Sequence, residues 1–245
     1  MFSRSRMTKI GLLVFVLGLI LLFPARVAYR WFAPAEFVAS GISGSVWSGH
    51  AMEATAYGTY FRDLSWRIRL LELVTAKLGY AIETQLASGF VEANIAIGFG
   101  GTLQATDLKA TLPLTSMQSI ASLPGIRGSV SADFSELKFV SGMPVSAAGV
   151  LEISGLTLPL VSSEALGGFR AEFFTQDSGI AASIEDTNAV IDIAGSLQLS
   201  SEGAYNFLAH LSATDDTPAP IRQQLQFLGP ANDRGQHELR LEGQL

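Results

Sequence analysis

Residues 189–212 read AVIDIAGSLQLSSEGAYNFLAHLS, and the alternation of apolar and polar side chains in this stretch decides the fold. Apolar residues recur at every second position in two runs, which a Ser-Glu-Gly turn sequence separates. Because successive side chains of a β-strand point to opposite faces, the pattern predicts two antiparallel strands with one apolar face. The residues of this face are Ala189, Ile191, Ile193, Leu197 and Leu199 in the first run, and Tyr205, Phe207, Ala209 and Leu211 in the second.

The same period of two extends in both directions along the chain. Towards the C-terminus, Leu239 and Leu241 alternate with charged neighbours and predict another strand. Towards the N-terminus, glycine-punctuated segments add strand candidates near 43–67, 80–99, 148–158 and 168–184. Most of the chain beyond residue 35 is therefore expected to form β-strands.

Two of the expected strands change phase within the strand. Leu103 and Ala105 occupy odd positions, whereas Leu108, Ala110 and Leu112 occupy even ones. A similar change separates Val130, Ala132 and Phe134 from Leu137 and Phe139. A β-bulge inserts one extra residue, which produces such a phase change and bends the strand. The sequence thus predicts a strongly curved sheet.

A few short helices are expected between the strands. The clearest is in Thr217–Gly229, where Thr217 is an expected N-cap, Pro218 follows it and Gly229 ends the amphipathic pattern. Weaker candidates are Leu70–Leu78, Thr115–Ser122 and Ser162–Leu166. The predicted fold class is mainly β: one N-terminal transmembrane helix, then a curved, bulged antiparallel sheet that is trough-like or sandwich-like.

Composition and charge exclude two classes of protein. The chain has 245 residues, of which 48% are hydrophobic, so it can bury a core and does not resemble a disordered chain. Five of its 16 Lys and Arg residues precede residue 35, so 11 remain against 22 acidic residues, a net charge of −11. Such a surface repels nucleic acid, whose binding requires neutralised phosphates.

The N-terminus carries a candidate membrane anchor. Ile10 to Phe23 reads IGLLVFVLGLILLF, which is uncharged but short for a span of about 20 residues, so flanking basic side chains would reach outward. The expected anchor residues are Leu12, Leu13, Val14, Phe15, Val16, Leu17, Leu19, Ile20, Leu21, Leu22 and Phe23. Residues expected at the interface, or to set the topology, are Arg4, Arg6, Lys9, Arg26, Arg30 and Trp31.

A cleaved signal peptide is the competing interpretation of this segment. The nearest small-x-small sequence, Ala33-Pro34-Ala35, lies beyond two arginines and a tryptophan, which favours a retained anchor. We expect residues 1–9 in the cytoplasm, 10–32 as a signal anchor with its interfacial flank, and 33–245 as one β-rich periplasmic domain. The expected location is the bacterial inner membrane, with a single pass.

No motif for catalysis is present. The chain has no cysteine, and its three histidines, His50, His210 and His237, lack any metal-binding spacing. Gly98-Phe99-Gly100-Gly101 lacks the third glycine of a dinucleotide fingerprint and predicts a hairpin turn. Paired carboxylates such as Asp215-Asp216 fit an exposed loop. We therefore expect no enzyme activity, no cofactor and no metal.

Two tryptophans stand in short glycine-flanked segments. Ser43–Ala51 reads SGSVWSGHA, and Asp63–Ile68 reads DLSWRI. Each indole can bury a large apolar area while its N–H requires an acceptor. A packing motif between paired strands is the favoured interpretation, and a contact site for a partner protein is the other.

This combination resembles the type II secretion system protein N family: a short anchor, then S-G-x-V-W-x-G-x-A, then D-L-S-W-R. The resemblance continues at Leu123–Gly128, Glu202–Tyr205, Leu225–Gly229 and Gly235–His237, and it covers nearly the whole chain. The segment Glu202–Tyr205 departs from the Asp-Gly-x-Tyr turn that the family would lead one to expect. The candidate structural or partner-contact residues are Gly44, Val46, Trp47, Gly49, Asp63, Trp66, Pro124 and Gly128.

The resemblance implies an accessory inner-membrane component of the general secretion pathway, which exports folded proteins across the outer membrane. It supplies no catalytic residue. The expected role is scaffolding or assembly through the periplasmic β-domain, with the lipid bilayer and other secretion-system components as partners. The alternative is a membrane-anchored β-trough that binds a lipid or another hydrophobic ligand along apolar residues such as Ile95, Ile97 and Ile193.

Overall fold

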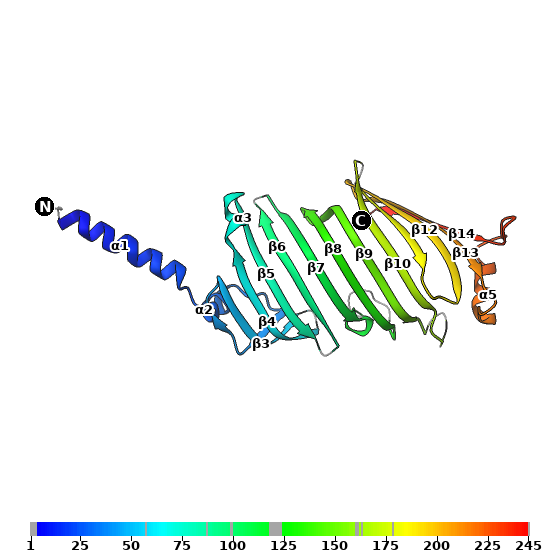
Figure 1. Ribbon diagram of the computed structural model, residues 1–245, viewed down its shortest axis with the longest axis horizontal. Coiled ribbons are helices and arrows are strands. Elements are labelled where there is room, and N and C mark those ends of the chain that lie inside the picture. Colours follow the sequence, from blue (N-terminus) through cyan, green and yellow to red (C-terminus); the bar gives the residue numbers. More distant parts are fainter. Residues whose placement is uncertain are drawn as a thin grey trace.

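The computed structural model describes residues 4–56, 58–86, 88–98, 100–117, 124–159, 162, 164–177 and 179–244. Figure 1 shows one long sheet with a helix at each end. The helices are α1 (Arg4–Leu21), α2 (Ala25–Phe32), α3 (Leu70–Val74), the 3₁₀ turn η1 (Leu114–Met117) and α5 (Ala219–Gln226). The strands are β1 (Phe37–Ser40), β2 (Ser43–Gly44), β3 (Ser48–Ala56), β4 (Thr59–Arg69), β5 (Lys77–Leu86), β6 (Gly89–Gly98), β7 (Thr102–Pro113), β8 (Arg127–Val140), β9 (Met143–Thr157), β10 (Gly167–Gln176), β11 (Gly179–Asp186), β12 (Ile191–Ser200), β13 (Ala204–Ala213) and β14 (His237–Gln244).

All the described strands belong to a single open antiparallel sheet. From β3 to β14 each strand pairs with the next one in sequence, β1 pairs with β3, and β2 pairs only with β3. Short turns make most of these connections, as the glycine-punctuated sequence predicted. Longer segments join β4 to β5, β7 to β8, β9 to β10 and β13 to β14, and three of them contain α3, η1 or α5. The mainly β, antiparallel prediction is confirmed. The sandwich-like form is wrong for the described strands, because none of them forms a second sheet.

One face of the sheet is apolar from β6 to β14. A continuous row of paired residues crosses the sheet from β6 to β14: Val91, Ala110, Ala132, Leu151, Ala171, Ile184, Gly195, Ala209 and Leu239. The opposite face is charged, and there Arg170 lies between Glu152 and Glu185. The alternation in the sequence therefore separates an apolar face from a solvated one.

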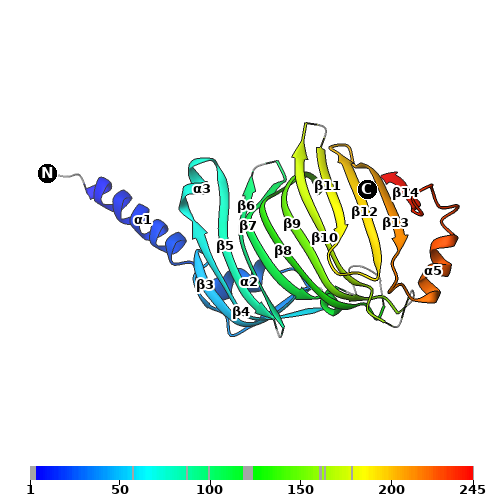
Figure 2. The ribbon, with the colours of Figure 1, turned by 45° about the vertical axis from the view of Figure 1, so that its right-hand side comes forward.

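The sheet curves strongly (Figure 2). Strands two apart in a flat sheet lie roughly 9.5 Å from each other. Some Cα atoms of β9 and β11, which β10 separates, nevertheless approach within 8 Å. On the apolar face, Phe134 of β8, Ala147 of β9 and Ile180 of β11 form one cluster. Side chains from strands that are not neighbours meet in this way only on a concave surface.

β-Bulges accompany the curvature at both positions where the sequence changes phase. The pairing of β7 with β6 shifts between the partners of Glu92 and Asn94, and Asp107 at that point has a φ of 50°. The pairing of β8 with β9 shifts between Phe134 and Glu136. The predicted bulges in these two strands are therefore confirmed, and each adds bending to its strand.

The core is thin because most of the apolar face has no second layer over it. No large side chain among the described residues is fully buried. Helix α2 covers the apolar face at one end of the sheet, where Ala25 packs with Ile42 and Ala51. Helix α5 covers it at the other end, where Leu225 packs with Ala209 and Leu211. Between the two helices, the apolar side chains pack mainly against their neighbours in the sheet.

The expected short helices are only partly confirmed. Helix α5 forms within Thr217–Gly229, but its N-cap is Pro218, because the Thr217 hydroxyl instead accepts from the Thr214 amide (2.7 Å). The helix expected at Leu70–Leu78 ends at Val74, since Lys77 and Leu78 already pair in β5. Of Thr115–Ser122, the described part lies in η1, and residues 118–122 are outside the described residues. The described residues of Ser162–Leu166 are not helical.

The N-terminal segment consists of two helices and not the single helix that the sequence predicted for it. Helix α1 ends at Leu21, and Pro24 precedes α2. Proline has no amide hydrogen and restricts the preceding residue to extended backbone, which explains the break. Among the residues that the structure describes, no helix combines the length and the apolar character that a membrane crossing requires.

Candidate functional site

The segment Ser43–Gly49, called the tryptophan loop below, is the site where the N-terminal helices join the sheet. It contains β2, the first residues of β3 and the turn between them, and Ser43 pairs with His50. The turn closes through the Ser45 amide, which donates to the Ser48 carbonyl (2.9 Å). The Ser45 hydroxyl accepts from the amides of Trp47 and Ser48, both at 3.3 Å. These bonds hold Trp47 at the tip of a rigid turn.

Two hydrogen bonds and a backbone bridge attach this loop to the end of α1 and to the residues that follow it. The Trp47 indole Nε1–H donates to the Ile20 carbonyl at 2.8 Å. The Val46 amide donates to the Phe23 carbonyl at 3.0 Å, and Ser45 forms an antiparallel bridge with Pro24. The last carbonyls of a helix have no partners within the helix, and the Ile20 carbonyl is one of them, so the Trp47 indole supplies a donor there.

Trp66 fixes the loop from the opposite side. Its indole Nε1–H donates to the Ser45 carbonyl at 3.1 Å, and the Ile68 amide donates to the Trp47 carbonyl. A side chain at Gly49 would place its Cβ 2.4 Å from the Ser43 carbonyl oxygen and 2.6 Å from Trp66 Cζ2. Glycine is therefore required where the Trp66 ring lies against the loop.

Gly44 is required for a second reason. Its φ is +88°, which L-residues rarely adopt, and a Cβ there would lie 2.5 Å from the Ser48 carbonyl oxygen. The predicted packing role of the two tryptophans and their flanking glycines fits this geometry.

Helix α2 adds a second attachment between the N-terminal segment and the sheet. The Arg26 guanidinium donates from Nε to the Ile42 carbonyl at 2.6 Å, and the Tyr29 hydroxyl accepts from the Ala39 amide at 3.0 Å. An apolar cavity of about 290 Å³ remains between α2 and the sheet, and Trp66 is among its lining residues. A second apolar hollow of about 490 Å³ lies between α1 and Trp47.

The predicted interface residues lie in both N-terminal helices. Arg4, Arg6 and Lys9 are in α1, whereas Arg26, Arg30 and Trp31 are in α2. Trp31 is 67% exposed, and its ring lies 6.0 Å from that of Phe23. Of these residues, Arg26 contributes to the attachment through its bond to the Ile42 carbonyl.

The remaining predicted site residues lie elsewhere in the sheet. Asp63 lies in a bulge of β4, where the pairing with β5 shifts, and its φ is 50°. Pro124 is in an exposed turn before β8. Gly128, at a φ of +126°, approaches the Ser154 carbonyl so closely that a Cβ would lie 2.7 Å from it. None of the loop contacts described above involves Asp63, Pro124 or Gly128.

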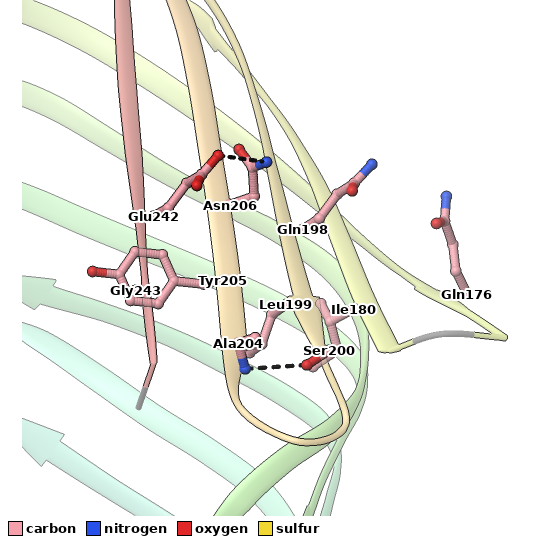
Figure 3. A pocket seen from close by; sticks show the side chains of 10 residues that line it. All are labelled: Gln176, Ile180, Gln198, Leu199, Ser200, Ala204, Tyr205, Asn206, Glu242 and Gly243. Atoms are coloured by element: carbon pink, nitrogen blue, oxygen red, sulfur yellow. Dashed lines mark hydrogen bonds between the residues drawn. The ribbon is translucent and has the colours of Figure 1, made fainter.

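A polar hollow on the sheet shows no arrangement for catalysis among its lining residues. It has a volume of about 480 Å³, lies at the turn between β12 and β13, and includes the row Gln198, Asn206 and Glu242 (Figure 3). Asn206 Nδ2 donates to Glu242 Oε1 at 3.4 Å, and the Ser200 hydroxyl accepts from the Ala204 amide. No histidine lines this hollow.

Metal ligands and acid–base groups give no other candidate site. No three His, Cys, Asp or Glu side chains in the described ranges gather as metal ligands. Two tyrosines have shifted proton affinities. A hydrogen bond to Glu53 raises the pKa of Tyr60, and burial raises the pKa of Tyr80. Both shifts move the groups further from neutral pH, where acid–base catalysts work best.

Comparison with known proteins identifies the family. Residues 35–240 match the family model described as type II secretion system (T2SS), protein N. The chain belongs to this family. It is similar to the type II secretion system protein N of Vibrio cholerae serotype O1, with 25% identity over 95% of each chain. It is also similar to the protein of the same name from Pectobacterium carotovorum, with 24% identity over 91% of this chain and 90% of that one. No solved structure matches the chain.

The part that matches the protein N family begins just before β1 and includes the tryptophan loop, Asp63, Trp66, Pro124 and Gly128. Family membership makes the chain an accessory component of a type II secretion system, with other components of that system as its partners. The predicted family is confirmed.

Some residues that hold the protein together could not be found from its sequence. The carbonyls of Ile20 and Phe23 accept bonds from the loop, but a main-chain acceptor leaves no mark on residue identity. The attachment of α2 through Arg26 and Tyr29 was also missed, because the basic and aromatic residues there also fit a membrane interface.

Proposed function

We propose that this protein is a non-enzymatic scaffold or assembly component of the type II secretion pathway, with its β-domain in the periplasm. The match of residues 35–240 to the protein N family carries the proposal. In this role, the sheet offers its curved faces and its edge at β1 to other components of the system. The proposed pathway exports folded proteins across the outer membrane.

We further propose that α1 anchors the protein in the inner membrane with its N-terminus in the cytoplasm. The side chains of Leu12 to Phe15 are exposed in succession, so the helix presents apolar groups on all sides. A helix that is apolar all round needs apolar surroundings. The proposal also rests on Arg4, Arg6 and Lys9, which precede the apolar run on the proposed cytoplasmic side.

The tryptophan loop gives the anchor a mechanical role in this proposal. Bonds from Trp47 and Val46 to the end of α1, together with the Arg26 contact, connect the helix to the first strands through several points. A force or tilt applied to the sheet by a partner would therefore reach α1 directly. A flexible linker would not transmit it.

Crosslinking in native membranes tests the scaffold role. Full-length chain, solubilised in mild detergent after brief crosslinking, should bring down other secretion-system components, and a deletion strain should secrete less of the exported proteins. Complementation with the wild-type gene should restore secretion. Recovery of no secretion component together with normal secretion by the deletion strain would refute the role.

Single cysteines test the topology, because the natural chain has none. Glu202→Cys lies in the exposed turn between β12 and β13, and Ser5→Cys lies in the basic part of α1. A membrane-impermeant maleimide, added to cells with a permeabilised outer membrane, should label Glu202→Cys and spare Ser5→Cys. The proposed orientation fails if Ser5→Cys is labelled, or if Glu202→Cys reacts only after the inner membrane is broken.

A hydrophobic ligand is the second candidate, and the uncovered apolar face favours it. Apolar side chains along the middle of this face, such as Ile95 and Leu137, remain only partly buried. A chain-like lipid could cover them and remove apolar surface from water. Native mass spectrometry after mild extraction tests this function. The candidate predicts a bound species of lipid mass, and a spectrum of bare protein in every charge state would remove it.

A further inference from the structure

The short helix α3, between β4 and β5, presents a cluster of exposed apolar side chains. Leu71 and Val74 are 83% and 85% exposed, and Leu70 is 68% exposed. Leu73 is also exposed. Scattered single apolar residues on a surface are ordinary, but several in one helical turn indicate a contact surface.

The structure turns the single acidic residue of α3 away from this cluster. Glu72 forms an ion pair with Arg69 at 3.5 Å and lies over Gly79 of β5. A Cβ at Gly79 would lie 2.4 Å from Glu72 Cγ, so glycine makes room for the carboxylate side chain against the sheet. The Thr75 amide donates to the Glu72 carbonyl at 3.1 Å and closes the turn. The apolar side chains consequently point outward.

Basic residues border the cluster within an otherwise acidic domain. Arg67, Arg69 and Lys77 lie on either side of α3, and Glu72 is the only acidic residue between positions 64 and 82. The domain beyond residue 35 has 22 acidic residues in total. Apolar side chains bordered by Lys and Arg fit the interfacial region of a bilayer with anionic headgroups.

The position of α3 agrees with this chemistry. Helices α1 and α3 lie at the same end of the long sheet, and α5 lies at the opposite end (Figures 1 and 2). A membrane that holds α1 is therefore close to the β4–β5 connection. Ile97, at the end of β6, and Leu103, at the start of β7, extend the exposed apolar surface along the same edge.

We propose that α3 and its basic border form a second membrane-contact site, which inserts Leu70, Leu71, Leu73 and Val74 into the lipid interface. The occupant is an anionic lipid surface. This inference rests on the proposed anchoring by α1. Two contacts with the membrane, one at each helix, would fix the direction of the sheet, whereas a single helix would let it rotate about the membrane normal.

Site-directed spin labelling of the full-length chain tests the inference. Nitroxides are attached to single cysteines at Leu71→Cys, Phe227→Cys and Leu17→Cys, and each protein is reconstituted into vesicles of phosphatidylcholine with phosphatidylglycerol. Phe227 is the matched control because it is 82% exposed and follows α5 at the far end. The ratio of oxygen to nickel-chelate accessibility should be several-fold higher at position 71 than at 227.

The three labels separate this inference from the proposed anchor. If the label at position 17 lies in lipid and the label at position 71 lies in water, the proposed α3 contact is wrong and the proposed α1 anchor is still supported. Water exposure at both 17 and 71 would overturn both proposals. Vesicles of phosphatidylcholine alone should reduce the ratio at 71 and leave position 17 unchanged. Protection of position 71 that appears only when other secretion components are added would also overturn a lipid occupant, in favour of a protein.

The substitution Leu71→Glu, which introduces a negative charge, provides a second measurement. Because this side chain is exposed, the substitution should leave thermal unfolding of the detergent-solubilised chain unchanged. It should still reduce the lipid accessibility of a label at Val74→Cys. An unchanged accessibility at Val74→Cys in a folded variant would contradict insertion.

Discussion

At the residue scale, Trp47 and Trp66 make the same kind of hydrogen bond to different partners. Each donates its indole N–H to a main-chain carbonyl: Trp47 to Ile20, and Trp66 to Ser45. A tryptophan side chain can pack its ring against apolar groups while its N–H donates such a bond. Trp66 thus secures the loop to the sheet, and Trp47 secures the loop to α1. Loss of the Trp66 bond would loosen the loop from the sheet, whereas loss of the Trp47 bond would loosen the loop from α1.

The substitution Trp47→Phe should loosen the joint between α1 and the sheet. It keeps an aromatic ring but removes the donor to the Ile20 carbonyl, at a cost of about 1 kcal/mol for one hydrogen bond. We expect faster hydrogen exchange in residues 20–24 and 43–49 of the detergent-solubilised chain. Exchange in β12 and β13 should stay as in the wild type.

Trp31→Phe is the matched control for this experiment. Trp31 is 67% exposed, lies in α2 and keeps its contact with Phe23 through an aromatic ring after substitution. If both variants accelerate exchange in residues 20–24 equally, the Trp47 hydrogen bond does not hold the joint.

In an alkaline titration, Tyr60 should lose its hydroxyl proton at a higher pH than an ordinary tyrosine. Its hydroxyl donates to Glu53 Oε1 at 2.8 Å, and this bond raises the pKa of Tyr60 above its usual value of 10.0. Because the folded protein then holds the phenolic proton more tightly than the unfolded chain, the bond supports folding below about pH 10. That support is lost as the pH rises through the raised pKa.

The substitution Glu53→Ala should bring the pKa of Tyr60 down towards its usual value. Absorbance of tyrosinate at 295 nm, compared between wild type, Glu53→Ala and Tyr60→Phe, measures the change. Because Tyr80 also titrates late, the late step should lose the contribution of one tyrosine in Tyr60→Phe, and that contribution should move to lower pH in Glu53→Ala. A late step at the same pH in wild type and Glu53→Ala would show that Glu53 does not hold the proton.

At the scale of the element, bulges that contain left-handed residues bend the strands. Asp63 in β4 and Asp107 in β7 have φ values of 50°, and both lie where the pairing shifts by one residue. Aspartate tolerates this backbone better than most residues, because its short side chain can bond locally. Asn94 Nδ2 donates to Asp107 Oδ2 at 3.0 Å and supports the bulge in β7.

Substitutions of Asp63, in the bulge of β4, should change the stability of the protein according to how readily the new residue adopts a positive φ. Asp63→Val should destabilise the protein by about 1–2 kcal/mol, because a β-branched residue is strained at positive φ. Asp63→Gly should be neutral or slightly stabilising. Urea denaturation of the solubilised chain, followed by tryptophan fluorescence, measures both.

The neighbouring substitution Arg62→Val controls for the loss of a charge and for the added β-branched side chain. Arg62 is exposed and pairs regularly with Gln85. Equal destabilisation by Asp63→Val and Arg62→Val would mean that backbone strain at position 63 is unimportant.

The elements that the sequence predicted are those that follow from the alternation of apolar and polar side chains. The phase changes after Ala105 and Phe134 revealed two bulges, because burial of one face forces apolar residues to follow the pleat. The pattern could not show how far the sheet closes, since one apolar face suits a trough and a sandwich equally. The break between α1 and α2 had a visible cause in Pro24, but the surrounding apolar and aromatic residues also fit one continuous anchor. The partners of Trp47 and Trp66 are carbonyl groups, which every residue has.

At the scale of the whole molecule, an open sheet leaves two edge strands that could pair with other chains. Strand β14 forms one of these edges, and its Glu238, Arg240 and Glu242 lie on the charged face. Arg240 and Glu242 also form an ion pair at 2.7 Å. Charged side chains on an edge strand discourage pairing with further strands.

Replacing these three charges with threonine should promote self-association. Threonine favours strands and removes the charge barrier, so the triple variant should elute earlier and show a higher mass by light scattering in detergent. A triple threonine variant of Glu202, Asp233 and Arg234, which lie in turns, makes the same change in net charge. This control should keep the wild-type mass. Identical masses for both variants and the wild type would show that the β14 charges do not protect the edge.

The order of the strands also determines when each part of the sheet can fold during synthesis. Nearly every strand pairs with its immediate predecessor in sequence, so a chain delivered from its N-terminus can fold as it arrives. Hairpins form in roughly 1–10 μs. Synthesis supplies only about 5–20 residues per second, so each strand can dock before the next is made. The tryptophan loop has its partners once β4 is complete, and the joint to α1 can therefore close long before β14 exists.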